Sequence, residues 1–246
     1  MSARAGRDIT GIILLSLVLW QFFTSGDAVN TMLYPQPRDI VAIFATDWRK
    51  MLLGIGSSMY LLGTGMGLAL ILGIVLGLLT GGSTRLSEAL LPLAKVISPV
   101  PPIIYTPYAV AVLPSFEIAS IFVIFSSIFW QIYIQVATAV RGIDPKLLDS
   151  ARTLNLNAWS MLWHVLWPYC LPRIMKELPV AVANAFMVLT AAEMIGAQSG
   201  LGYYVRYYAD FADYTRVIAG ILLIGIVVSL LNGGIAILER RLVRWH

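Results

Sequence analysis

Long runs of residues without a charged side chain alternate with short polar segments along this sequence. A helix needs roughly 20 apolar residues to cross the hydrocarbon core of a bilayer. Six uncharged runs reach this length or come near to it: Ile9–Gly26, Leu52–Thr84, Val96–Ser115, Ile118–Val140, Leu178–Ala192 and Val217–Leu238. The pattern predicts an all-α polytopic membrane protein with about six transmembrane helices.

The first run has two interpretations. Arg4 and Arg7 precede a short apolar stretch, which is also the arrangement of a secretory signal peptide. The sequence that follows, TSGDAVN, lacks a small-x-small cleavage site. We therefore expect a span that is retained rather than a leader that is removed.

Composition and charge agree with a membrane protein and give its orientation. Only 12% of the residues are charged and the mean hydropathy is +0.80, whereas in soluble domains about a quarter of all residues are charged. With six spans, the loops on one side hold 12 of the 17 Lys and Arg residues. Because cytoplasmic loops are enriched in basic residues, we expect both termini in the cytoplasm. The net charge of +4 then follows from topology and gives no reason to invoke nucleic acid.

One polar segment, DPKLLDSARTLNLNAWSMLWHVLWPYCLP at Asp144–Pro172, interrupts the apolar pattern. Asp144 suits an N-cap, and Pro145 suits the first helical position, where a missing N–H costs nothing. Asn155 stands where this helix would end, because asparagine tolerates the left-handed conformation of a C-terminal cap. The segment therefore begins with a short capped helix and a turn.

A second short helix follows the turn. Asn157 can cap it, and Trp159 begins an apolar stripe at helical spacing. Pro168 and Pro172 are expected to end this helix before the chain returns to the membrane. Two amphipathic helices on a cytoplasmic surface fit a groove in another protein or a layer of lipid headgroups; periodicity leaves both open.

The hairpin resembles the cytoplasmic loop of permease subunits in bacterial ABC importers. That loop has the pattern E-A-A-x3-G-x9-I-x-L-P, and on its spacing the chain has Asp149-Ser150-Ala151, Asn155 and Val165-Leu166-Trp167-Pro168. The chain departs from the pattern with Asp for Glu, Ser for the first Ala, Asn for Gly, Val for Ile and Trp for Leu. The segments SPVPPIIYTPYAVAVLP, AVRGIDPKLLDSARTLN and AAEMIGAQSGLGYYV are similar to the nitrate, sulfonate, taurine and bicarbonate permeases. Together the similar segments extend over roughly Leu90–Val205.

The resemblance implies the fold of a type I ABC importer permease in the bacterial inner membrane, as one transmembrane domain over residues 1–246. Its coupling loop, at about 141–175, would dock on an ATP-binding cassette subunit through Asp149, Ser150, Ala151, Asn155, Asn157, Trp159 and Pro168. The implied partners are also a second permease copy, membrane lipid and a periplasmic or lipid-anchored solute-binding protein. The chain itself would hold no cofactor and catalyse nothing, since ATP and Mg would bind to the partner subunits. The implied solute is a small anion or organic acid: nitrate, bicarbonate, or a sulfonate such as taurine.

The translocation path has candidates in the third and fourth runs. Proline removes a backbone donor, and unpaired backbone within a membrane is tolerated only inside protein or beside water. Pro101 and Pro102 are therefore expected either to line the path or to kink a helix that its neighbours cover. Gln131 and Gln135 lie four residues apart and so share one helical face, where their amides fit either the path or hydrogen bonds between helices.

Glu193 is the one ionisable residue of the fifth run, and ionisable residues at membrane depth are functional candidates. The following GAQSGLG predicts a turn at the outer surface. Glu193 is therefore expected on the path, or in water, or paired with Arg206.

The second run contains Gly63, Gly67, Gly73 and Gly77, a pattern that lets helices approach closely. No spacing of Cys, His or carboxylates predicts a metal site. Two other classes of function stay open. A self-contained secondary carrier or channel would need ion-coupling residues within the membrane, where only Glu193 is available. A membrane-embedded enzyme would need clustered carboxylates or histidines, which the sequence does not offer.

Overall fold

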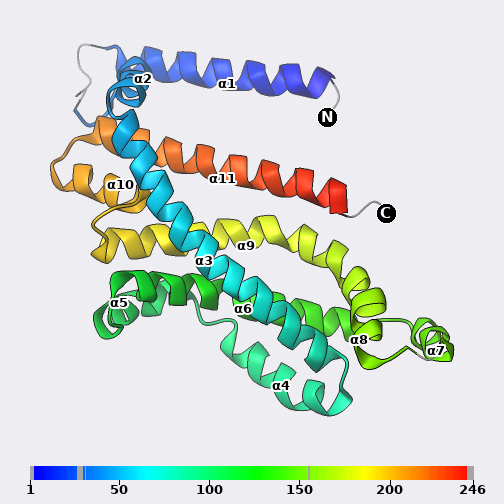
Figure 1. Cartoon of the computed structure of the whole chain (residues 1–246). Coiled ribbons are helices and arrows are strands. Elements are labelled where there is room, and N and C mark those ends of the chain that lie inside the picture. Colours follow the sequence, from blue (N-terminus) through cyan, green and yellow to red (C-terminus); the bar gives the residue numbers. More distant parts are fainter. Residues whose placement is uncertain (1–2, 27–29, 31, 155, 243–246) are drawn as a thin grey trace.

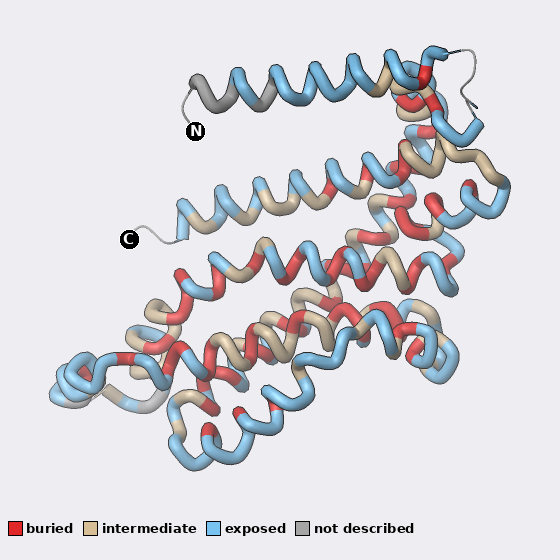
Figure 2. Tube along the Cα trace, turned by 180° about the vertical axis from the view of Figure 1, so that it is seen from behind, coloured by how far each residue is buried: buried red, intermediate tan, exposed pale blue. Residues whose placement is uncertain are grey.

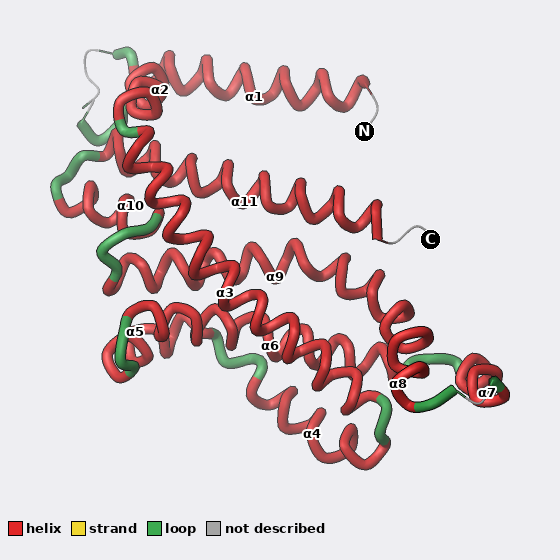
Figure 3. The backbone as a smooth tube through the Cα atoms, viewed as in Figure 1, coloured by secondary structure: helices red, strands yellow, loops and turns green. Residues whose placement is uncertain are grey.

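A computed structural model describes residues 3–26, 30, 32–154 and 156–242, and every regular element in these ranges is helical (Figure 3). In chain order (Figure 1) the elements are α1 (Ala3–Thr24), α2 (Pro37–Thr46), α3 (Trp48–Gly81), α4 (Thr84–Ile97), α5 (Pro102–Val112), α6 (Phe116–Arg141), α7 (Pro145–Thr153), α8 (Ala158–Met161), the π-helical turn η1 (Leu162–Leu166), α9 (Trp167–Gly196), α10 (Leu201–Asp210) and α11 (Tyr214–Leu242).

The helices α3 and α6 lie side by side along a seam of small residues. Gly73 faces Ile132, Gly77 faces Val136 and Gly81 faces Val140, so the register between the two helices is constant. A Cβ added at Gly77 would lie 2.8 Å from the Cβ of Val136, which leaves no room for a side chain. The predicted glycine packing is confirmed for Gly73 and Gly77. Gly63 and Gly67, in contrast, face open space within this chain.

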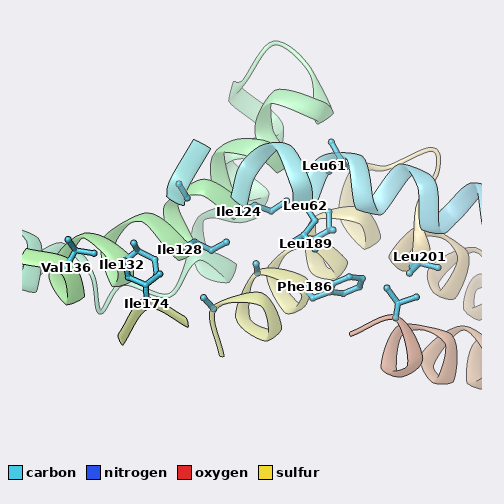
Figure 4. Packing of buried hydrophobic residues seen from close by; sticks show 14 of the residues in the cluster. Leu61, Leu62, Ile124, Ile128, Ile132, Val136, Ile174, Phe186, Leu189 and Leu201 are labelled. Carbon is cyan, nitrogen blue, oxygen red and sulfur yellow. The ribbon is translucent and has the colours of Figure 1, made fainter. Parts of the chain in front are cut away.

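The hydrophobic core lies where α6 packs between α3 and α9. Ile124, Ile128 and Ile132 of α6 are fully buried, and Phe186 and Leu189 of α9 close the core from the other side (Figure 4). Burial is concentrated in these three helices, whereas α1 is exposed along most of its described length and packs on α2 (Figure 2).

Fewer helices than the six predicted are long and apolar enough to span a membrane within the described residues, and several boundaries differ from the prediction. Four helices are long and apolar enough to cross a membrane: α3, α6, the continuous helix Trp159–Gly196, and α11. The pair α4 and α5 is bent by 86° and forms a broken span or a re-entrant loop. The predicted third run thus covers only the end of α4 and α5, because the prolines between them break the helix. The first predicted run lies largely in the helix α1, whose stretch Gly11–Thr24 is apolar.

The elements divide between two ends of the bundle. The helices α2 and α10 and the turn between α9 and α10 lie at one end, called here the α10 end (Figure 1). The helices α7 and α8 lie at the opposite end, called here the hairpin end. The first turn of α1 and the last turn of α11 point toward the hairpin end, as the predicted topology requires.

Candidate functional site

The first helix of the hairpin forms because its N-terminus is capped. The backbone N–H of Lys146 donates to Asp144 Oδ1 at 2.9 Å, and the N–H of Leu148 donates to the Asp144 carbonyl. Pro145 occupies the first position of α7, where its missing N–H leaves no bond unmade. The predicted cap is therefore confirmed. Asn155, predicted to form the turn, lies outside the described residues.

The second helix is also capped as predicted, but it does not end as predicted. The N–H of Ser160 donates to Asn157 Oδ1 at 2.7 Å. From there the chain passes through the π turn η1 directly into α9, so that one helix continues past Pro168 and Pro172. The prediction that these prolines end the helix was wrong. Pro168 lies just after the π turn η1 and Pro172 lies inside α9, and membrane helices tolerate internal prolines where the local helical geometry adjusts.

Three of the predicted coupling residues meet at a hollow of about 390 Å³ between the two arms of the hairpin. Ser150, Ala151 and Pro168 line it, and Ala151 is only 7% exposed. His164 and Tyr169 also line the hollow, and the sequence patterns did not single them out for this role. The hollow therefore joins residues from both sides of the turn into one surface.

A second feature of the hairpin is its exposed apolar surface. Leu154 is 72% exposed and Trp159 is 68% exposed. The indole rings of Trp159, Trp163 and Trp167 form a ladder, with neighbouring ring centroids 6.0 and 6.2 Å apart. Asp149 also lies on the exposed side of α7. Tryptophan is the residue most enriched in the energetically dominant part of protein interfaces, so this surface is suited to a protein partner.

The predicted path residues fall into two separate places. Pro101 caps α5 and Pro102 begins it, so both lie at the bend between α4 and α5. Beside the bend, α5, α6 and the end of α4 line a half-open pocket of about 620 Å³. Gln131 and Gln135 are not among its lining residues, because they lie on another face of α6. Neither the two prolines nor the two amides line this pocket.

Glu193 lies neither in water nor beside Arg206. Its side chain is 1% exposed, and both carboxylate oxygens accept hydrogen bonds from within the chain. The Ser58 hydroxyl donates to Oε1 at 2.6 Å, and the Gly202 N–H donates to Oε2 at 2.7 Å. Arg206 instead donates to backbone carbonyls at the end of α9 and pairs with Asp210. Glu193 therefore ties α3, α9 and α10 together, and the sequence could not reveal a partner 135 residues away.

A second polar cluster at the α10 end surrounds Asp47. Its Oδ2 accepts from Arg216 Nε at 2.8 Å, from the Tyr204 hydroxyl at 3.1 Å and from the Tyr208 hydroxyl at 3.2 Å. Burial raises the pKa of the Asp47 carboxyl, but the hydrogen bonds from Arg216 and Tyr204 and the nearby positive charges lower it more, leaving it below its ordinary value. The cluster joins the start of α3 to α10 and α11. Sequence patterns missed it because its members are distant along the chain.

Within the described residues, no three His, Cys, Asp or Glu side chains lie close enough to hold a metal ion.

Comparison with known proteins identifies the family to which the chain belongs. Residues 69–244 match the family described as "Binding-protein-dependent transport system inner membrane component". The taurine transport system permease protein TauC of Escherichia coli is 27% identical over 254 residues, which cover 98% of this chain and 91% of that protein. The nitrate import permease protein NrtB of Leptolyngbya laminosa is 32% identical over 189 residues, which cover 77% of this chain and 68% of that protein.

The fold is shared with a solved transporter. A chain of the MetNI methionine ABC transporter, in an inward facing conformation, superposes with a TM-score of 0.70 at 16% identity, covering 80% of this chain and 98% of that chain. Since the family match extends over most of the sequence and the fold agrees with it, the chain belongs to the binding-protein-dependent transport system inner membrane components and is a permease subunit of an ABC importer.

Proposed function

We propose that two copies of this chain form the translocation path of an importer for a small anion or organic acid of the nitrate, bicarbonate or sulfonate class. The names of the taurine and nitrate relatives support this solute class. Each copy would dock on an ATP-binding subunit that holds ATP and Mg, while the permease itself binds neither. A periplasmic or lipid-anchored binding protein would deliver the solute to the outer mouth.

The observation that carries the coupling role is the surface of the hairpin. Leu154 and Trp159 expose apolar side chains, and the hollow around Ala151 gives that surface a concave element. Because η1 and α9 continue the second arm without a break, a displacement of the hairpin passes directly into a membrane helix. ATP-driven closure of the partner subunits would thus move α9 and alternate access to the path.

In the proposed orientation the chain spans the inner membrane of a bacterial cell, and the hairpin and both termini face the cytoplasm. The excess of basic residues on that side supports this orientation. The ends of α1 and α11 that point toward the hairpin end agree with it (Figure 1).

Affinity purification of the tagged chain from its native membranes tests the proposal. An ATP-binding cassette subunit is expected in near-equal amount, with ATP-driven solute uptake by the complex after reconstitution. Ala151→Glu, which places a charge in the hollow, should remove the subunit and abolish uptake. The matched control Thr46→Glu adds the same charge at an exposed site of the α10 end and should change neither. A wild-type chain that purifies folded but alone would overturn the proposal.

A further inference from the structure

The bend between α4 and α5 lies opposite the middle of α6. Leu91 and Ala94 of α4 pack against Tyr133 and Ala137, in the half of α6 nearer the hairpin end. Ala109 of α5 packs in a cluster with Val123, in the other half of α6. Because α6 itself is long enough to cross a membrane, the residues of the bend lie near the centre of the bilayer.

The bend carries backbone groups that lipid cannot satisfy. Pro99, Pro101 and Pro102 have no N–H, and within the described ranges no donor reaches the carbonyl oxygens of Ser98, Pro99 or Val100. Hydrocarbon chains offer no donor, so such backbone persists at this depth only inside protein or beside water. The side of the bend that carries these carbonyl oxygens therefore does not face lipid.

The pocket beside the bend, called here the aromatic pocket, has uncharged walls. Its lining residues are Ile97, Val100, Tyr105, Tyr108, Ala109, Val112, Leu113, Phe122, Phe125, Ser126, Phe129 and Trp130. Phe129 stacks on Phe125 with centroids 5.0 Å apart and meets the Trp130 ring edge-on at 4.9 Å. The only hydrogen bond between lining side chains joins the Tyr105 and Ser126 hydroxyls at 2.6 Å, among the described residues.

Such walls are suited to an organic molecule and unsuited to an inorganic oxyanion. Sites for small molecules are typically concave and apolar with a few polar groups, in volumes of about 300–1,000 Å³. Burying apolar surface yields about 25 cal/mol per Å², whereas nitrate or bicarbonate has no such surface to bury. Aromatic faces also carry negative partial charge, so they repel an anion that lies against them.

We propose that the aromatic pocket is a solute-binding site on the translocation path, and that it takes an organic solute with a ring-sized apolar body. The body lies against Phe125, Phe129 and Trp130, and the polar head lies toward the water at the bend, within reach of the Tyr105 and Ser126 hydroxyls. A cavity of about 150 Å³ is enough for benzene, so about 620 Å³ holds a ring, a head group and water. The inference rests on the proposed function and narrows its solutes to organic sulfonates or carboxylates.

The test measures binding of 4-fluorobenzenesulfonate by fluorine NMR to the purified permease with its ATP-binding subunit in lipid nanodiscs. Methanesulfonate and nitrate serve as competitors. The aromatic probe is expected to bind at least tenfold more tightly than methanesulfonate, and nitrate should not displace it. Phe129→Leu, which keeps apolar volume but removes the ring, should weaken binding about fivefold. Ser126→Trp should fill the pocket and abolish binding.

Ser229→Trp is the matched control, because Ser229 is an exposed serine of α11 and does not line the pocket. It should bind the probe as the wild type does. Probe binding that survives Ser126→Trp would place the probe in the bilayer and overturn the inference. If native mass spectrometry shows that Ser126→Trp separates two paired permease copies, the pocket is an interface between the copies. That result would also overturn the inference. If the complex assembles and hydrolyses ATP but binds no probe, the pocket assignment fails while the proposed function stands.

Discussion

The two ends of the bundle are held together in different ways. At the α10 end, hydrogen bonds connect residues that are far apart in sequence: Ser58 with Glu193, Asp47 with Arg216, and Lys50 with Tyr208. At the hairpin end, the bonds of α7 and α8 mostly join residues within four positions of each other, as in the caps of Asp144 and Asn157. The α10 end is therefore fixed within one chain, whereas the hairpin keeps its shape locally and leaves its apolar surface uncovered.

The α10 end should therefore determine the stability of the folded chain, and the hairpin its assembly with the ATP-binding subunit. Changes at the α10 end should lower the free energy of unfolding, because they remove long-range bonds that no partner replaces. Changes on the hairpin surface should lower affinity for the ATP-binding subunit with little effect on the folded chain.

The largest effect is expected at the turn between α9 and α10. Gly200 has φ +124°, a conformation open to glycine almost alone, and an added Cβ would collide with the Glu193 carboxylate. Gly200→Ala should cost about 3 kcal/mol of unfolding free energy. The matched change Gly142→Ala, at the hairpin end, meets only ordinary contacts at 3.5 Å and should be near neutral. Thermal melts in detergent compare the two, and equal losses would remove the contrast between the ends.

On the hairpin surface, Trp159→Ala should reduce affinity for the ATP-binding subunit. Truncating a tryptophan at the centre of an interface typically costs about 2 kcal/mol, which corresponds to about a 30-fold loss of affinity. The melting temperature of the chain should stay unchanged, because this side chain is 68% exposed. Trp48→Ala removes an exposed tryptophan at the other end of the bundle and serves as control. Titration of the purified subunit gives the affinity. A destabilised Trp159→Ala with normal affinity would contradict the assembly role.

Glu193→Gln should lower the unfolding free energy by about 2 kcal/mol, because it replaces two hydrogen bonds to a carboxylate by weaker bonds to a neutral amide. If the amide oxygen accepts from the Gly202 N–H, the amide nitrogen faces the Ser58 hydroxyl, which already accepts from the Leu201 N–H. Binding to the ATP-binding subunit should stay normal. The melting temperature and the subunit titration together check this. An unchanged melting temperature would show that the carboxylate is not what joins α3 to α10.

The smallest effect is expected for Asp47→Asn, about 1 kcal/mol at neutral pH, since Arg216 is partly exposed. The folded-state pKa of Asp47 lies below its ordinary value of 3.8, so the charge stabilises the fold above that value. This stabilisation is lost as the pH falls through the lowered pKa. The gap in melting temperature between wild type and variant should therefore close in acid. A difference in melting temperature that stays constant as the pH falls would show that the effect of Asp47→Asn does not come from the lost charge.

Local features of the sequence were sufficient for the hairpin caps. Asp144 and Asn157 bind N–H groups two and three positions away, so their partners are fixed once a helix begins. The end of the second helix could not be predicted in the same way. Whether Pro168 ends a helix or continues it depends on the π turn before it, which the residue type of Pro168 does not reveal.

Among the path candidates, the bend at Pro101 and Pro102 follows from the missing N–H groups alone. The pocket beside it does not, because the rotation of α6 decides which side chains face the bend. That rotation is set by the seam in which Gly73 and Gly77 meet Ile132 and Val136; it directs Phe129 toward the pocket and leaves Gln131 outside its lining.

The sequence by itself determined most of the apolar helices, the break at Pro101 and the N-terminal caps of the hairpin at Asp144 and Asn157, because each depends on neighbours within a few residues. Only the tertiary structure decided the partner of Glu193, the cluster at Asp47 and the walls of the aromatic pocket. Each of these depends on the register between helices that are distant in the chain, and that register is a property of packed surfaces rather than of any one segment.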